Sequence, residues 1–316
     1  MNILLIGAGA VGIAIAASVA SQGADVSIYA RGDTAKAIKE NGIKRIGLSE
    51  NLEIRDIPVF EDYNEIPKDT FDYIFIASKI TANEDIANNL NSHKDIFKNN
   101  TKLIIFQNGF GNDETYLKYF TKKHVYCARI LGCFMRDERN TSNITCFLGP
   151  MLLGSLQNES GKNLEEIADL LTASGFPCEV TDELDKYLWA KMLYTCALNP
   201  LGAVLDCTCG ELTENPYSVD IINNIIDEIF NVIKASPYET LWQNSEEYKK
   251  VFYSRLVPET YDHYSSTHAD VKNKKKTEID SFNGKIFRLG EKYDVNVDTN
   301  KFVYYLIKSL ETKFKN

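Results

Sequence analysis

The sequence predicts a chain in two parts: an α/β part built on a doubly wound parallel sheet, followed by an all-α C-terminal domain. Up to about residue 181, apolar runs of strand length alternate with helical patterns, which is typical of a parallel sheet covered by helices on both faces. Beyond Asp182 the strand signals disappear, and helical patterns continue to the C-terminus. We therefore expect two domains, 1–182 and 183–316.

The first 31 residues carry the most specific pattern. An apolar run at 3–6 is followed at once by Gly7-Ala8-Gly9-Ala10-Val11-Gly12, then by a helical segment and a second strand at 25–30. In such a unit the first glycine allows a tight turn, the second lets a pyrophosphate approach the backbone, and the third lets helix and strand pack closely. The helix N-terminus offers N–H groups and a partial positive charge to the phosphates. The sequence therefore predicts a Rossmann-type dinucleotide site on residues 7–12.

The end of the second strand predicts which nucleotide is bound. An NAD-binding unit places Asp or Glu there to accept hydrogen bonds from the ribose hydroxyls, whereas this chain has Ala30-Arg31-Gly32. An arginine cannot accept, but it can pair with a 2′-phosphate through two parallel hydrogen bonds. The alternative interpretation is a solvated arginine after a strand. We expect NADPH/NADP+ as the cofactor, with Arg31 on the 2′-phosphate.

Composition narrows the class of protein. The length of 316 residues suggests two domains, and the net charge of −9 argues against a general nucleic-acid binder. No basic residue precedes the apolar stretch 3–20 and glycines interrupt it, so we expect neither a signal peptide nor a membrane span. Seven scattered cysteines, an odd number, favour free thiols in a reducing compartment. We expect a cytoplasmic protein without a metal site.

The other elements of the first part follow from apolar runs and turn residues. We expect helices at 34–40, 82–90, 113–120 and 161–174, short strands within 43–60, strands at 71–77, 102–107, 125–130 and 177–181, and a hairpin of strands 144–148 and 151–155. Lys79 and Asn108 follow two of these strands. Because ligands bind beyond the carboxyl ends of parallel strands, we expect Lys79 and Asn108 beside the glycine loop and Arg31.

The helix predicted at 184–204 carries a polar face. Lys191, Thr195 and Asn199 are spaced i, i+4 and i+8 and so share one side of the helix. The rest of this helix is apolar enough to bury two faces, so the polar side suits the wall of a cleft that binds a ligand. An ordinary exposed polar face is the alternative. Pro200 removes the backbone hydrogen bond to Cys196 and predicts a kink.

Another helix is predicted to begin near Ser265-Ser266-Thr267, with Thr267 and Asp270 as a capping box. Its expected buried stripe comprises Ile279, Phe282, Ile286 and Leu289. Glu278 would lie beside this stripe, three turns after Ser266. The lysine-rich run 272–276 reads as the solvated face of a helix, or alternatively as an attractor of anionic ligands. The aromatic-rich segment 238–264 predicts helical packing or a subunit contact, with a lid as the alternative.

Together these motifs resemble those of the ketopantoate reductase (2-dehydropantoate 2-reductase) family. The resemblance runs from Met1 to about residue 295 and rests on the glycine fingerprint with Arg31, Lys79, Gln107-Asn108-Gly109, Lys191-x7-Asn199-Pro200-Leu201, Gly210-Glu211-Leu212, Ser265-Ser266 and Thr277-Glu278-Ile279-Asp280-x-x-Asn283-Gly284. It implies an N-terminal Rossmann domain, a helical substrate domain, and NADPH-dependent reduction of a 2-keto acid in the cleft between them. The family acts on 2-dehydropantoate, in pantothenate and coenzyme A synthesis.

The resemblance also implies roles for single residues. Lys191 resembles the general acid, and Asn108, Asn199 and Ser266 resemble substrate contacts. We expect Lys191 and Thr195 to contact the substrate as well. Lys79, Asn108 and Glu278 resemble cofactor contacts. Thr195 and Cys209 stand where the family commonly has asparagines. A reductase of the same fold acting on another branched or hydroxylated 2-keto acid therefore stays open, as does a non-catalytic NADP(H)-binding sensor. The expected partner is a small 2-keto acid, and a homodimer is a compatible assembly.

Overall fold

The computed structural model describes residues 1–48 and 50–314. Contacts divide the chain into two compact units. The first unit comprises Met1–Asn108 and Asn112–Leu184, and the second comprises Gly109–Gly111 and Asp185–Asn316. In the part of the chain that the structure describes, no helix combines the length and apolar character needed to cross a membrane.

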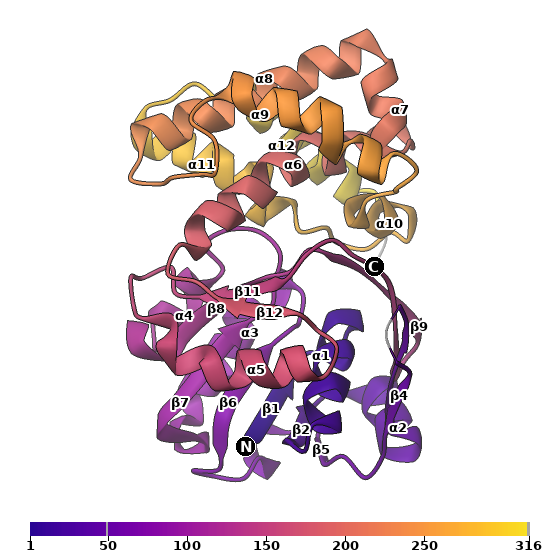
Figure 1. Cartoon of the computed structure of the whole chain (residues 1–316), viewed down its shortest axis with the longest axis vertical. Coiled ribbons are helices and arrows are strands. Elements are labelled where there is room, and N and C mark those ends of the chain that lie inside the picture. Colours follow the sequence, from indigo (N-terminus) through magenta and orange to yellow (C-terminus); the bar gives the residue numbers. More distant parts are fainter. Residues whose placement is uncertain (49, 315–316) are drawn as a thin grey trace. The chain divides into compact units, whose positions relative to one another are not determined.

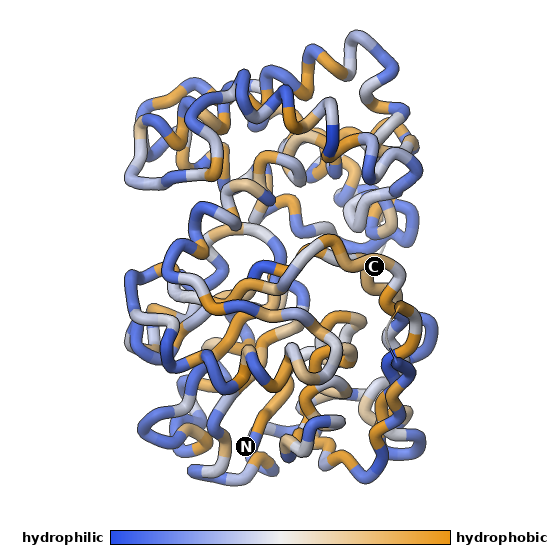
Figure 2. The backbone as a smooth tube through the Cα atoms, in the orientation of Figure 1, coloured by the Kyte–Doolittle hydropathy of each residue, from blue (hydrophilic) through white to orange (hydrophobic). Residues whose placement is uncertain are grey.

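An eight-stranded sheet forms the centre of the first unit (Figure 1). Its strands, in spatial order, are β12 (Cys178–Val180), β11 (Met151–Gly154), β8 (Val125–Arg129), β7 (Phe97–Ile105), β6 (Phe71–Ile76), β1 (Asn2–Ile6), β2 (Asp25–Tyr29) and β5 (Val59–Phe60). All neighbours are parallel except β11 and β8. Residues 3–6 are buried, as expected of a strand covered on both faces, and Figure 2 shows this hydrophobic run rising from the N-terminus.

Helices cover this sheet. They are α1 (Ala10–Ser21), α2 (Gly32–Asn41), α3 (Asn83–Ser92), α4 (Asp113–Leu117) and α5 (Glu165–Ala173), with short 3₁₀ turns at Tyr63–Glu65, Ile80–Ala82, Lys94–Ile96, Lys122–His124 and Gly161–Leu164. Residues 12–19 of α1 are all buried, because this helix also packs against a second, smaller sheet. One hydrophobic core joins α1, both sheets and α5. The helix that follows the glycine loop is therefore held firmly by the core.

The first unit also contains a smaller, four-stranded sheet, whose strand pairing differs from the prediction. Its order is β4 (Leu52–Ile54), β3 (Ile43–Gly47), β10 (Thr141–Phe147) and β9 (Gly132–Glu138). The predicted hairpin of 144–148 and 151–155 is wrong, because β10 pairs with β3 and β9 while β11 pairs with β8 and β12. All four residues of β11 are buried, so this strand needs a sheet covered on both faces. Sequence reasoning missed β9 altogether.

A disulfide joins Cys133 and Cys146, which are register partners in β9 and β10. Their Cα atoms lie 4.8 Å apart, within the range that a disulfide requires. The expectation that all seven cysteines are free thiols is wrong for this pair, because sequence spacing did not reveal that the two strands are neighbours. The remaining cysteines are free thiols: Cys127, Cys178, Cys196, Cys207 and Cys209.

The described residues of the second unit form helices joined by turns and loops, without a strand (Figure 1). Its helices are α6 (Leu184–Leu205, beginning on the last residue of the first unit), α7 (Cys209–Glu214), α8 (Pro216–Ala235), α9 (Ser245–Val251), α10 (Ser266–Lys272), α11 (Asn283–Tyr293) and α12 (Asp298–Glu311). A π-helical turn covers Phe252–Leu256, and 3₁₀ turns cover Pro258–Thr260 and Ile279–Ser281. The buried isoleucine stripe of α8 packs against α7, α9, α11 and α12.

The single helix predicted from Ser265 to beyond Leu289 is wrong. α10 ends at Lys272, Lys274 has a positive φ of 52°, and α11 begins only at Asn283. The chain turns here because the run 272–276 holds no apolar residue to bury, and all five residues are exposed. The predicted apolar stripe is nevertheless buried, split between the 3₁₀ turn and α11.

The aromatic-rich segment 238–264 supplies packing inside the second unit. Tyr248 and Phe252 are fully buried, and their ring centroids lie 5.6 Å apart. Trp242 packs edge-on against Tyr248 at 4.6 Å, and Phe252 reaches Tyr194 on α6 at 6.1 Å. For these residues, the prediction of helical packing is confirmed.

Candidate active site

The glycine loop of the first unit has a different spatial reason for each glycine. Gly7 has a φ of 105°, and a Cβ atom on it would overlap the Ser78 backbone nitrogen. A Cβ on Gly12 would overlap the Gly7 carbonyl oxygen, so this glycine allows α1 to approach β1. A Cβ on Gly9 would find only the Ala77 oxygen, 3.9 Å away. Protein packing therefore requires Gly7 and Gly12, whereas at Gly9 the protein leaves space.

The start of α1 suits an anionic ligand. Gly9 is the N-cap and makes no side-chain capping bond, and the first turn of α1 holds no acidic residue. Ala10 and Val11 open the helix, after the buried Ala8. An uncapped N-terminus of a buried helix, beside open space at Gly9, fits the pyrophosphate of a dinucleotide.

Arg31 directly precedes α2, as its extended N-cap residue, and is exposed. Both carboxylates near the start of α2 are paired with cations. Asp33 lies 3.0 Å from the Arg139 guanidinium. Glu61 accepts a hydrogen bond from the Gly32 N–H and lies 2.8 Å from the Lys39 ammonium, contacts that lower the pKa of its carboxyl, with the Lys39 bond as the largest cause.

The β9–β10 turn adds positive charge at this helix end. Arg136 donates to the Thr34 hydroxyl at 2.9 Å and also to the Arg139 carbonyl oxygen at 2.6 Å. Burial lowers the pKa of Arg136, and the neighbouring Arg139 lowers it further. Three guanidinium groups, of Arg31, Arg136 and Arg139, thus belong to segments that meet at the first turn of α2.

The carboxyl ends of the central strands are level with one another. Ile6 of β1 pairs with Tyr29 of β2 and with Ile76 of β6, and Ile76 pairs with Ile105 of β7. The glycine loop, Arg31, Lys79 and Asn108 each follow one of these strand ends within a few residues. The structure therefore gathers the first-unit residues of the predicted site along one edge of the sheet.

Gln107 braces this edge, and sequence reasoning gave it no such role. Its amide nitrogen donates to the Ser78 carbonyl oxygen at 2.9 Å and to the Asn83 side chain at 2.6 Å. Asn83 returns a bond to Gln107 at 3.0 Å and accepts one from the buried Tyr116 hydroxyl at 3.2 Å. These bonds fix the turns that carry Lys79 and Asn108. Two amides far apart in sequence gave no local signal of this pairing.

In the second unit, Lys191, Thr195 and Asn199 lie on one side of α6. Thr195 is 6% exposed, whereas Lys191 and Asn199 are half-buried. The helix runs on through Pro200 to Leu205, so Pro200 lies inside it. Because Pro200 has no N–H, the Cys196 carbonyl loses its helical partner, and the Asn283 side chain donates to this oxygen at 3.2 Å.

The start of α10 is tied to Asn199. Ser265 is the N-cap of α10: its hydroxyl accepts from the His268 N–H at 3.1 Å and donates to the Asn199 carbonyl oxygen at 3.1 Å. The predicted capping box of Thr267 and Asp270 is therefore wrong by two residues. Ser266 is exposed and directly follows this tie. The second unit thus brings Ser266 to the Asn199 end of the polar side of α6.

Cys209, one of the two residues that depart from the family pattern, is surrounded by other protein groups. Cys209, at the start of α7, is buried, and its sulfur lies 3.6 Å from the Tyr194 hydroxyl. That hydroxyl also bonds the Thr260 hydroxyl at 2.6 Å. Burial raises the pKa of both Cys209 and Tyr194, so both stay neutral at pH 7. The Cys209 thiol is part of the packing between α6, α7 and the 258–260 turn.

Glu278 does not lie on a long helix with Ser266, as predicted, but precedes the 3₁₀ turn Ile279–Ser281. It is half-buried between two fully buried neighbours, Thr277 and Ile279.

Within residues 1–48 and 50–314, no three His, Cys, Asp or Glu side chains gather as metal ligands would.

The sheet order and the glycine loop define a Rossmann-type dinucleotide-binding protein. Residues 3–158 match the family model of ketopantoate reductase PanE/ApbA, and residues 183–311 match the model of its C-terminal part. The chain belongs to the ketopantoate reductase family and is an NADP-dependent oxidoreductase.

Curated relatives match over the whole chain. The 2-dehydropantoate 2-reductase of Aquifex aeolicus is 35% identical over 315 residues, covering 98% of this chain and 97% of the relative. The enzyme of the same name from Pyrococcus horikoshii is 28% identical, covering 99% and 98%. Both relatives are therefore similar in length and domain content to this chain.

Solved structures share the fold. A PanE/ApbA family ketopantoate reductase from Ralstonia eutropha superposes with a TM-score of 0.86 at 21% identity, over 100% of both chains. A D-mandelate dehydrogenase, solved with NADH and anilino(oxo)acetate, gives a TM-score of 0.85 at 24% identity, over 99% of both chains. At these identities the likeness establishes the architecture alone.

The glycine loop allows a matched pair of substitutions. Gly9→Ala should leave the melting temperature unchanged but raise the Kd for NADPH by at least about tenfold, because its methyl group enters the space next to the α1 N-terminus. Gly12→Ala should instead destabilise the apo protein by about 1–3 kcal/mol, through overlap with the Gly7 oxygen. Thermal unfolding and NADPH titration of both variants test this. Equal NADPH affinity for Gly9→Ala and wild type would contradict it.

Proposed function

We propose that the chain reduces 2-dehydropantoate to pantoate with NADPH, a step of pantothenate and coenzyme A synthesis. The observation that carries this proposal is the polar side of α6, where Lys191, Thr195 and Asn199 follow one another and Ser265 ties Asn199 to the segment of Ser266. The names of the relatives that match over the full chain support the same activity. We assign residues 1–182 to cofactor binding and 183–316 to substrate binding and catalysis.

The cofactor assignment follows from the fit of the first unit. Residues 7–12 would hold the pyrophosphate, Arg31 the 2′-phosphate, and Lys79 and Asn108 the remainder from the adjacent strand ends. From the second unit, Glu278 would accept hydrogen bonds from the cofactor. The pairing of Asp33 with Arg139 and of Glu61 with Lys39 supports the 2′-phosphate assignment, because it offsets two negative charges close to the start of α2.

The catalytic assignment rests on the chemistry of the side chains. Bound NADPH supplies the hydride, and negative charge then builds on the ketone oxygen of the substrate. The Lys191 ammonium would stabilise this charge and donate the proton that completes the hydroxyl group. Asn108, Thr195 and Asn199 would orient the substrate through hydrogen bonds. Ser266 would bind its carboxylate or hydroxyl without adding charge.

A second candidate is reduction of a different branched or hydroxylated 2-keto acid. Thr195 and Cys209 replace asparagines, and the Cys209 sulfur is engaged by Tyr194, so two amide contacts to a hydroxylated substrate are missing. The fold also serves a D-mandelate dehydrogenase, whose name indicates another 2-hydroxy acid. The favoured substrate of this chain remains 2-dehydropantoate, on the strength of its full-length relatives.

A panel of 2-keto acids tests the substrate. The expected result is NADPH oxidation with the highest kcat/KM for 2-dehydropantoate, compared with unhydroxylated branched and aromatic 2-keto acids. A higher kcat/KM for one of the others would favour the second candidate. NADPH binding without turnover of any of them would indicate a non-catalytic sensor.

Substitution of Arg31 tests the cofactor assignment. Loss of a charge-assisted pair should lower the kcat/KM preference for NADPH over NADH by about 10- to 150-fold in Arg31→Ala. Arg31→Lys keeps the charge but loses the two parallel bonds, so its preference should fall between those of Arg31→Ala and wild type. An unchanged preference in Arg31→Ala would remove this residue from the 2′-phosphate site.

Substitution of Lys191 tests the general acid. Lys191→Ala should lower kcat by about 10²–10⁴-fold, because the alkoxide loses its proton donor, while the Kd for NADPH changes little. Lys234→Ala, at an exposed position near the end of α8, is the matched control and should retain full activity. Steady-state kinetics and NADPH titration measure both effects. Near-normal kcat in Lys191→Ala would exclude lysine from the mechanism.

A further inference from the structure

Besides the buried Ile279, which packs against Ile307, four residues of the motif from Thr277 to Gly284 contact α12. The Thr277 N–H and hydroxyl donate to the same Glu311 oxygen, at 2.8 and 2.7 Å. Asp280 accepts from the Tyr304 hydroxyl at 2.8 Å and from the Lys308 ammonium at 3.1 Å.

Asn283 and Gly284 are the other two residues of the motif that contact α12. The Asn283 amide donates to the Asn300 side-chain oxygen at 3.0 Å. A Cβ atom on Gly284 would come within 2.8 Å of the Tyr304 ring. These four residues are thus engaged by the protein itself, and Glu278 is the motif position assigned to the cofactor.

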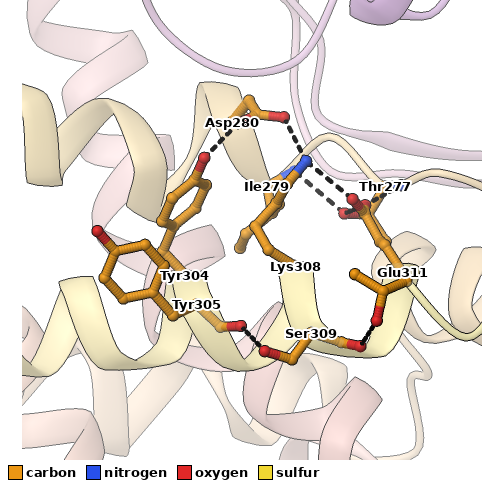
Figure 3. A network of polar contacts seen from close by, with 9 residues as sticks. Thr277, Ile279, Asp280, Tyr304, Tyr305, Lys308, Ser309 and Glu311 are labelled. Atoms are coloured by element: carbon orange, nitrogen blue, oxygen red, sulfur yellow. Dashed lines mark hydrogen bonds and ion pairs between the residues drawn. The ribbon is translucent and has the colours of Figure 1, made fainter.

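Lys308 links the two halves of the α12 contact (Figure 3). Its ammonium lies 2.9 Å from Glu311 and 3.1 Å from Asp280. Although partial burial opposes the effect, the hydrogen bonds to Glu311 and Asp280 raise the pKa of Lys308, so it stays charged at neutral pH. The Glu311 side chain is only 7% exposed, whereas the side chains of Lys308 and Asp280 are 37% and 43% exposed.

Apolar packing also attaches this segment to α12. Ile279 and Ile307 are both fully buried and form an apolar cluster with Ala203 of α6, which supplies the hydrophobic part of the contact. Ion pairs that are partly exposed, as these are, contribute little net stability compared with apolar packing, but ionic and polar contacts can fix one arrangement among several. The network therefore sets where the segment 277–280 lies on α12.

We propose that Glu311 and Lys308 of α12 are positioning residues for NADPH binding, which act by holding the segment that carries Glu278. Thr277 and Asp280, on either side of Glu278, are both bonded to α12, which leaves the Glu278 backbone little freedom. A preorganised carboxylate loses less entropy when the cofactor binds. This inference rests on the proposed contact between Glu278 and the cofactor.

Two conservative variants test the inference in the full-length protein. Glu311→Gln keeps the shape but removes the charge that Lys308 meets, and Thr277→Val removes the hydroxyl bonded to Glu311. Each should raise the KM and the Kd for NADPH by about 3- to 10-fold, since part of one hydrogen bond to the cofactor is lost, while kcat at saturating NADPH stays within about twofold. Glu291→Gln, on the exposed side of α11, is the matched control and should leave both constants unchanged.

A double-mutant cycle separates positioning from a general structural effect. In a Glu278→Ala background, Glu311→Gln should raise the KM for NADPH no further, because the group that it positions is gone. Equal effects of Glu311→Gln with and without Glu278 would overturn the proposal, as would an unchanged KM in both Glu311→Gln and Thr277→Val. If Glu278→Ala itself binds NADPH normally, the assignment of Glu278 under the proposed function fails, and this inference fails with it. Should Glu311→Gln not fold, Thr277→Val in the same cycle decides.

Discussion

Backbone polar groups must find partners, and this constraint organises both units. At Pro200 the helix α6 loses one N–H, so the Cys196 carbonyl has no helical donor, and Asn283 supplies one from another segment. At the start of α1 the N–H groups of the first turn receive no side-chain cap, because Gly9 has no side chain and no acidic residue follows in that turn. The Cys196 carbonyl is thus satisfied by the protein, whereas the N–H groups at the start of α1 are suited to an anionic ligand.

The hydrogen bond that Asn283 donates to the Cys196 carbonyl also links parts of the second unit that are distant in sequence. Asn283 bonds Cys196 of α6 and Asn300 of α12, and Asn300 in turn bonds Glu228 of α8. The helix that carries Lys191 is therefore connected to the helix that holds Thr277 and Asp280. The distinctive pattern of the sequence, Asn199-Pro200 and Asn283-Gly284, reflects this packing as much as it reflects chemistry.

Features set by neighbours in sequence could be predicted, and features set by distant partners could not. The glycine loop, the central strands and the polar side of α6 depend on spacing within one segment, and the structure has them at the predicted residues. The partners of β10, the Cys133–Cys146 disulfide and the break after Lys272 depend on which segments meet in space. Likewise, nothing near Gln107 or Glu311 in sequence indicates Asn83 or Thr277 as its partner.

The negative charge of the chain opposes binding of an anionic cofactor only when the chain is considered as a whole. The net charge is −9, but exposed charges more than about 10 Å apart are largely screened at physiological salt. In the proposed site, a 2′-phosphate would therefore meet the local set of charges at the start of α2. There Arg139 pairs with Asp33 and Lys39 pairs with Glu61, so these carboxylates do not stand unopposed beside Arg31. Local pairing, and not overall charge, makes an acidic protein compatible with NADPH.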